Sequence, residues 1–234
     1  MMTKQSHCSL HGFVGAFLLA CSAWPAVAQD GMALEITASA DLEHDPSIDV
    51  ANSELDGRKT LRISTTTGDG VVLLPISMAD GFVEVEVNSN LVPDAPAGSR
   101  GFAGIAFRVQ PDLHRYDAFY IRPGNGRAEE QIRRNHATQY ISHPDYTWFR
   151  LREEKPGHYE SYVDIELGTW TSLRVEVEGD RARFFVNQNE QPVLIVNDLL
   201  SDASEGAIGL WIASGTDAHF ANVRYGPLGS DEER

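Results

Sequence analysis

Residues 101–109 read GFAGIAFRV, and this stretch decides the fold. Every second residue from Ala103 to Val109 is apolar, which puts four apolar side chains on one side of an extended chain. The opposite side carries two small residues, Gly104 and Ala106, next to Arg108. Alternation with a period of two is typical of a β-strand that buries one face. We therefore predict a strand with one face in the core and, on the other face, room for a ligand beside Arg108.

The same alternation recurs along most of the chain. Similar runs occupy residues 82–87, 116–122, 170–177, 182–187, 207–213 and 219–225. Turn-forming stretches rich in Gly, Pro, Asn and Asp separate these runs. Many short strands with even turn spacing are typical of two-sheet proteins. The sequence predicts an all-β jelly-roll sandwich of two antiparallel sheets, in one domain over residues 29–234.

Residues 126–135 are the one stretch with helical features. Glu129 and Arg133, like Glu130 and Arg134, are spaced i,i+4 as in a helix. The apolar residues of this stretch are too few to bury a helix face. We therefore predict an extended, polar strand here.

Six motifs occur in a fixed order along the chain. They are DGFVEVEV at 80–87, GFAGIAFR at 101–108, YDAFYIRP at 116–123, WTSLRVEV at 170–177, ARFFVN at 182–187 and AHFANVRY at 218–225. In this order they resemble the concanavalin A-like lectin/glucanase superfamily, especially its laminin-G-like branch and the 3-keto-disaccharide hydrolase domains. The resemblance covers about residues 33–227. It implies a concanavalin A-like jelly roll whose concave sheet commonly presents a carbohydrate site, although fold analogy does not by itself settle function.

Residues 1–28 have the order of a secretory signal peptide. Lys4 comes first, an apolar run over residues 12–24 follows, and Ala26-Val27-Ala28 forms a small-x-small cleavage site. This run is shorter than the roughly 20 residues that cross a bilayer, so we predict no transmembrane segment. We expect the protein to be exported to the periplasm or the extracellular space.

Both cysteines, Cys8 and Cys21, lie in the segment that cleavage would remove. The mature chain would then hold no disulfide, no thiolate metal site and no cysteine nucleophile. In an alternative interpretation, Leu18-Leu19-Ala20-Cys21 is a lipoprotein cleavage site and Cys21 is lipidated. The leucine just before the small residue fits that pattern poorly.

Charge is distributed unevenly along the sequence. The whole chain has a formal net charge of -15, which argues against a nucleic-acid partner. Between Arg100 and Arg152, however, nine arginines stand against five acidic residues. Such a basic island can bind a carboxylate or sulfate, because the guanidinium group binds oxyanions in a bidentate fashion. The alternative is that these arginines pair with local acids or cover the sheet.

Our first functional hypothesis is an exported module that binds an oligosaccharide or polysaccharide, with an anionic glycan as the specific case. Arginines would bind acidic groups, aromatic rings would stack on sugar rings, and Asn and His would recognise hydroxyl groups. The candidate ligand-binding residues are Arg108, Tyr120, Arg122, Arg127, Arg133, Asn135, His136, Tyr140 and Trp148. The alternative for the aromatic residues is ordinary packing against neighbouring strands or at the edge of the core.

The second hypothesis is a glycan-cleaving hydrolase of the 3-keto-disaccharide kind. The candidate proton-transfer groups are Glu129, His136 and Tyr140. Family-16-type glucanases carry Glu-x-Asp-x-Glu on one strand, and the closest match here is Glu84-Val85-Glu86-Val87-Asn88. Because the amide of Asn88 cannot donate a proton as a general acid, that mechanism is in doubt. Whether the protein is an enzyme is left open, as are its oligomeric state and a third hypothesis, adhesion to another protein.

No metal-binding pattern stands out in the sequence. There is no His-x-x-x-His and no cluster of aspartates in one loop. Calcium commonly stabilises jelly rolls of the superfamily that the chain resembles, but Phe220-Ala221-Asn222 stands where many relatives have an acid. We predict no cofactor and assign calcium to no residue.

Overall fold

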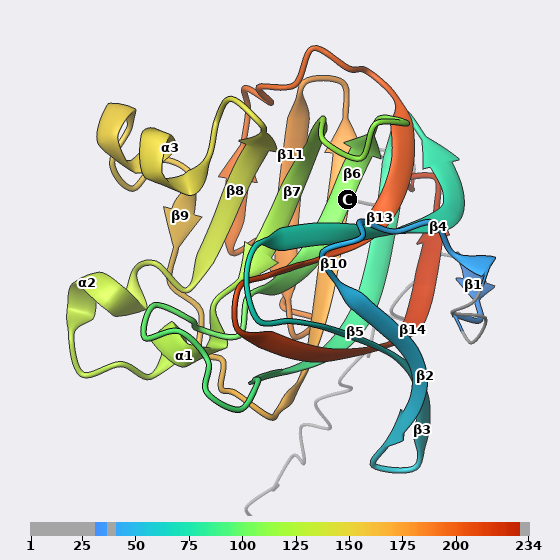
Figure 1. The fold of residues 1–234 in the computed structure, drawn as a ribbon. Helices are drawn as coiled ribbons and strands as arrows, with labels where there is room; N and C mark the ends of the chain where they lie inside the picture. The colour runs from blue at the N-terminus through green and yellow to red at the C-terminus, as the bar shows by residue number, and fades with distance from the viewer. Residues whose placement is uncertain (1–30, 37–40, 230–234) are drawn as a thin grey trace, which may run out of the picture.

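The computed structural model describes residues 31–36 and 41–229, and the predicted signal peptide lies outside these residues. The described strands form two sheets in which all paired strands run antiparallel. The sheets enclose a common apolar core, and Figure 1 shows their arrangement. The all-β, two-sheet fold class is confirmed.

The larger sheet has eight strands. Its order is β12 (Leu194–Val196), β11 (Arg181–Val186), β10 (Trp170–Glu178), β5 (Gly81–Leu91), β14 (Thr216–Gly226), β3 (Arg58–Thr65) and β2 (Asp49–Leu55), and β1 (Met32–Leu34) also pairs with β14. Some neighbours in this sheet are distant in sequence, since β5 lies between β10 and β14. This crossing of connections is typical of a jelly roll.

The smaller sheet has six strands. Its order is β4 (Asp69–Met78), β13 (Gly206–Ala213), β6 (Ala103–Val109), β7 (Tyr116–Ile121), β8 (Thr138–His143) and β9 (Glu160–Ser161). The helices α1 (Pro123–Gly126), α2 (Gln131–Arg134) and α3 (Trp148–Glu154) lie beside β8 and β9 in Figure 1. Across the described ranges, no helix has the length and apolar character needed to cross a membrane.

Aromatic side chains join the two sheets. The rings of Phe119 on β7 and Phe184 on β11 stack with their centroids 4.5 Å apart. Phe107 and Tyr140 also contact Phe184 from the six-stranded sheet. Full burial of each such ring contributes roughly 1.5–3 kcal/mol to folding.

All of the alternating runs predicted as strands fall in β5, β6, β7, β10, β11, β13 and β14.

The strand predicted over residues 126–135 is wrong, because α1 and α2 occupy part of this segment. The backbone N–H of Arg122 donates to the carbonyl of Ala137 at 2.7 Å, so the chain leaves and rejoins the sheet at the same place. Since β7 and β8 already pair with each other there, the intervening residues cannot form a strand between them. Their backbone groups bond within tight turns instead.

The predicted position of Arg108 is also wrong. Phe107 and Arg108 of β6 together oppose a single residue of β13, which is a β-bulge. Arg108 has a φ of 54°, and this left-handed conformation ends the alternation that Gly104 and Ala106 follow. Its buried guanidinium donates to the carbonyl of Gly179, in the turn between β10 and β11.

Next to Arg108, the carboxyl group of Asp117 is fully buried. The hydroxyl of Tyr140 donates to its Oδ1 atom at 2.7 Å. Burial raises the pKa of Asp117 to about 6, although hydrogen bonds from Tyr140 and Ser142 and the charge of Arg108 act in the opposite direction. The folded protein therefore holds a proton on Asp117 in a pH range where the unfolded chain has released it.

We predict that this proton makes Asp117 a source of pH-dependent stability. Its contribution is complete below pH 3.8 and is lost as the pH rises through about 6, a difference of about 3 kcal/mol. Urea denaturation measures the free energy of unfolding of Asp117→Asn and of the unsubstituted protein. Between pH 4 and pH 7, the difference between them should shift in favour of Asp117→Asn by about that amount, because only the unsubstituted protein loses the contribution of this proton. Asp180→Asn, at an exposed turn, is the control and should show no such change. Identical pH profiles for Asp117→Asn and the unsubstituted protein would contradict the prediction.

Candidate functional site

The outer face of the six-stranded sheet carries a hollow of about 420 Å³ whose lining includes four large aromatic side chains. Phe102 precedes β6, Tyr120 lies on β7, Trp148 begins α3 and Trp211 lies on β13. We call this hollow the aromatic half of the cleft. Asp69, His143 and Ser214 add polar groups to its lining.

Gly104 makes room for two of these rings. It lies on β6 between Tyr120 of β7 and Trp211 of β13, which are its direct partners in the sheet. A Cβ atom at position 104 would lie 2.6 Å from the Cα of Tyr120 and also clash with the carbonyl of Phe119. With glycine there, the two rings meet with centroids 4.4 Å apart. Gly104, the small residue in the middle of β6, thus allows the rings of Tyr120 and Trp211 to meet.

A second hollow of about 280 Å³ adjoins the first, and both are lined by Gly98, Phe102 and Trp148. We call it the basic half. Its charged or ionisable lining residues come from several elements: Arg100, Arg122, Arg133, His136 and Arg152. The loops and helices beside β8 therefore bring together arginines that are far apart in sequence.

One buried carboxylate organises the basic half. Glu160 on β9 has a side chain only 2% exposed and accepts hydrogen bonds from Arg122 at 3.0 Å and from Arg152. Burial opposes its ionisation, but the hydrogen bond from Arg152 and the charge of Arg122 outweigh burial and lower the pKa of Glu160. Arg122 also donates to the hydroxyl of Tyr120 at 2.9 Å, which ties the basic half to the aromatic half.

Two further guanidinium groups have only backbone carbonyls as hydrogen-bond partners within the described part of the chain. Arg100 donates to the carbonyls of Ala97 and Ser99, and Arg133 donates to that of Gly124. Burial and the nearby charges of Arg133 and Arg122 lower the pKa of Arg100. The basic half therefore holds positive charge that Glu160 does not balance.

His136 lies in the wall of the basic half. Its Nε2 atom is 3.5 Å from Oε2 of Glu160, and its backbone carbonyl accepts hydrogen bonds from Arg122 and Asn125. Burial lowers the pKa of His136, and Arg152 and Arg122 lower it further, whereas Glu160 acts in the opposite direction. The His136 ring is therefore mainly neutral near pH 7.

The structure brings five of the predicted site residues together along the cleft. These residues are Tyr120, Arg122, Arg133, His136 and Trp148. Of these, Arg122 is almost fully used by its hydrogen bonds inside the protein, to Glu160, Tyr120, His136 and Gln139. Arg122 therefore positions its neighbours more than it offers a free binding group.

The remaining predicted residues lie elsewhere. Arg108 is at the bulge described above, and Arg127 pairs on the surface with Asp164 at 2.8 Å and with Glu166. Tyr140 points into the core, where its ring packs on Phe184 and its hydroxyl binds Asp117.

The two other candidates, Glu129 and Asn135, are exposed on the connection that holds α1 and α2. Neither residue lines either half of the cleft. The acidic partner of His136 is Glu160 rather than Glu129.

Sequence reasoning missed several cleft residues. Arg100 and Arg152 mark the two ends of the basic island, so charge alone could have identified them. Phe102 and Trp211 lie on the outward faces of alternating stretches, but only strand order shows that β13 is a neighbour of β6. Glu160 gives no sequence signal, because β9 has only two residues.

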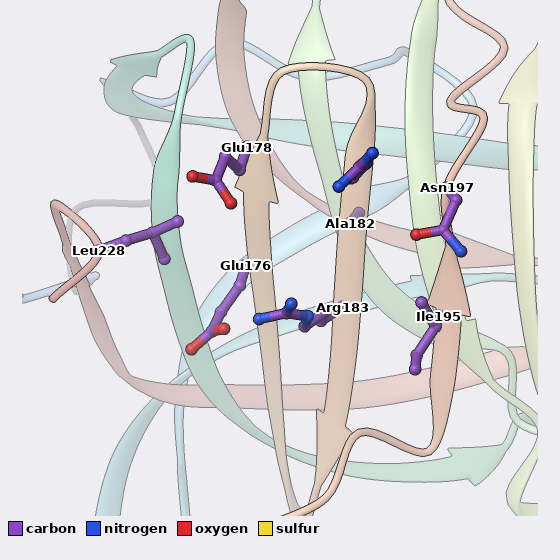
Figure 2. A pocket seen from close by; sticks show the side chains of 8 residues that line it. Glu176, Glu178, Ala182, Arg183, Ile195, Asn197 and Leu228 are labelled. Carbon is purple, nitrogen blue, oxygen red and sulfur yellow. The ribbon is translucent and has the colours of Figure 1, made fainter. Parts of the chain in front are cut away.

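The eight-stranded sheet carries a different hollow of about 270 Å³ on its outer face, at β10, β11 and β12. Figure 2 shows the Arg183 guanidinium extending from β11 towards Glu176 on β10, with Glu178 nearby. Opposite charges alternate here, and no aromatic ring lines the hollow. The cleft on the six-stranded sheet is therefore the better candidate for a binding site.

The described residues contain no group of three or more His, Cys, Asp or Glu side chains placed to hold a metal ion. Calcium is assigned to none of them.

No family model matches the chain, and no curated protein matches it. Among solved structures, it is similar to the carbohydrate-binding module CBM66 from Bacillus subtilis, with 17% identity and a TM-score of 0.53 over 76% of this chain and 93% of the module. A protein of unknown function with a galectin-like fold, from Bacillus subtilis, also has a TM-score of 0.53, with 11% identity over 82% of this chain and 91% of that one. The lumenal domain of VIP36 has a TM-score of 0.48, with 13% identity over 80% and 85% of the two chains. The fold is a jelly-roll sandwich of the concanavalin A-like type, as the motif order predicted.

Proposed function

We propose that the protein binds carbohydrate in the cleft on its six-stranded sheet. The observation that supports this proposal most is the aromatic half, where Tyr120, Trp148 and Trp211 surround a hollow of about 420 Å³. This volume lies within the range of roughly 300–1,000 Å³ that is usual for small-molecule sites. Trp148 is 44% exposed, so its ring is open to a sugar ring. Asp69 and Ser214 supply oxygen acceptors for hydroxyl groups.

The glycan that we propose carries acidic groups. Arg100 and Arg133 line the basic half with only backbone carbonyls as recorded partners in the described chain, and a carboxylate or sulfate would complement them. A sugar ring on Trp148 would extend from the aromatic half into the basic half, because this residue lines both. The structural likeness to a carbohydrate-binding module is consistent with this proposal.

We favour binding over hydrolysis. Of the groups considered for proton transfer, only His136 reaches the cleft. Its neighbour Glu160 is engaged by Arg122 and Arg152, which keep the carboxylate ionised and occupied. A hydrolase would need a second proton-transfer group beside His136, and the other acid and base of the cleft, Asp69 and His143, line the aromatic half instead.

Replacing Trp148 by alanine tests the stacking platform. We expect Trp148→Ala to weaken binding of oligosaccharides by about tenfold, because a stacked aromatic ring contributes about 0.5–1.5 kcal/mol beyond its buried area. Isothermal titration calorimetry measures the change. The matched control is Phe149→Ala, since Phe149 is the next residue and is 64% exposed but lines neither half of the cleft. Equal losses in both variants would contradict a specific role for Trp148.

Replacing Arg133 by alanine tests the acidic ligand. We expect Arg133→Ala to weaken binding of trigalacturonate by about fivefold to tenfold, to weaken its salt dependence, and to leave the affinity for cellotriose unchanged. The control is Arg127→Ala, which removes an exposed arginine already paired with Asp164 and Glu166. If Arg133→Ala leaves trigalacturonate binding unchanged, or if no oligosaccharide produces heat with the unsubstituted protein, the proposal fails.

We also propose that the protein acts outside the cytoplasm, as the order of residues 1–28 predicts. Expression of the full chain in a Gram-negative bacterium, followed by cell fractionation and mass spectrometry, tests this. We expect a mature chain that begins at Gln29 in the periplasm or the medium. A full-length cytoplasmic product would contradict export, and a lipid-modified chain that begins at Cys21 would favour the alternative cleavage.

A further inference from the structure

The basic half holds a titratable group that the proposed binding of an acidic glycan does not yet use. His136 lies in the wall of this hollow with its side chain 20% exposed. The same wall presents Arg100 and Arg133, for which the described chain supplies only backbone partners. An oxyanion that binds these two arginines would therefore lie in the same hollow as the imidazole.

From this geometry we infer that binding of an oxyanion in the basic half adds a proton to His136, so that acidic glycans bind more tightly as the pH falls. The inference rests on the proposed function and assigns a form of regulation to the same site. It concerns carboxylates and sulfates alike, because both present oxygen acceptors to the guanidinium and imidazolium groups.

The charges around His136 explain why a ligand would change its protonation. The groups that face it from the neighbouring elements, or line the same hollow, are Glu160 on β9, Arg152 on α3, Arg122 after β7, Arg133 on α2 and Arg100 before β6. Four of these five groups are positive, and the one negative group is already held by Arg122 and Arg152. Without a ligand, burial and the charges of Arg152 and Arg122 lower the pKa of His136, although Glu160 acts in the opposite direction.

An oxyanion reverses this balance. Its charge partly cancels that of the neighbouring arginines, and it can accept a hydrogen bond from the imidazolium. Both effects raise the pKa of His136 in the complex above its value in the free protein. A group whose pKa rises on binding strengthens binding as the pH falls, until the group is charged in both states. The uptake of a proton is greatest at a pH where the group is charged in the complex but neutral in the free protein. Trigalacturonate stays ionised at such a pH, since carboxyl groups titrate near pH 4.

The test is calorimetric titration of the full protein with trigalacturonate at about pH 5.5 and about pH 7.5. We expect affinity to be about threefold to tenfold higher at the lower pH, because raising the His136 pKa by one can strengthen binding up to tenfold. Repeating the titration near pH 6.5 in buffers of different ionisation enthalpy measures the protons taken up, and we expect uptake of a fraction of one proton per ligand. Binding of cellotriose should be accompanied by no proton uptake.

Two variants and one spectroscopic measurement identify the group. His136→Gln should abolish the proton uptake and flatten the pH dependence. His158→Gln is the matched control, because His158 also lies 3.5 Å from a carboxylate, that of Asp198, but lines neither half of the cleft. In the unsubstituted protein, the NMR titration midpoint of the His136 imidazole should rise on saturation with trigalacturonate, so the test does not depend on the folding of a variant.

The outcomes separate this inference from the proposed function. Trigalacturonate that binds without proton uptake, or an His136→Gln variant that still takes up a proton, would overturn the inference and leave glycan binding intact. Failure of every oligosaccharide to bind at both pH values would overturn the inference and the proposed function together. A sulfated trisaccharide that takes up a proton as trigalacturonate does would support an oxyanion site. A sulfated trisaccharide that binds without proton uptake would overturn the inference for sulfates.

Discussion

The cleft depends on the buried carboxylate of Glu160. It holds Arg122 from the end of β7 and Arg152 from α3, so the last strand of the six-stranded sheet fixes the positions of a neighbouring loop and a helix. Removing one partner of such a buried pair typically costs about 3–5 kcal/mol, since the other charge is left uncompensated. Arg122 extends this restraint to Tyr120 and Gln139. A short strand with no sequence signal of its own therefore shapes both halves of the cleft.

The aromatic half depends on a different constraint, the absence of a side chain at Gly104. Backbone of β7 lies where a Cβ atom would be, and the rings of Tyr120 and Trp211 close over the gap. Trp148, at the start of α3, completes the lining of the hollow; α3 is the helix that follows β8 in the chain. Packing within the sheet and a buried ion pair beside it thus act together to place apolar rings next to guanidinium groups. This combination suits a ligand that has both flat apolar faces and acidic substituents.

The sequence was sufficient for the fold because alternation reports directly which residues of a strand face the core. It was less informative where the backbone departs from regular geometry. The bulge at Phe107 and Arg108 turns Arg108 away from the outer face, and a period of two cannot anticipate an extra residue. The connection between β7 and β8 forms helical turns because its two ends are bonded together, which is a tertiary constraint. The basic island contains the arginines that line the cleft, but only the structure separates Arg127, which has acidic partners, from Arg100 and Arg133.

For the acidic glycan that we propose as the ligand, the uneven distribution of charge has a consequence for how the two molecules approach each other. Its net charge of -15 repels such a polymer from most directions, while the arginines beside β8 and β9 attract it over a distance set by the Debye length of about 8 Å at physiological salt. The resulting torque would rotate an approaching molecule until its positive edge leads. Several copies bound to one polymer chain would expose their negatively charged surfaces to one another. Electrostatic repulsion would then keep them apart and limit how many copies bind per length of polymer.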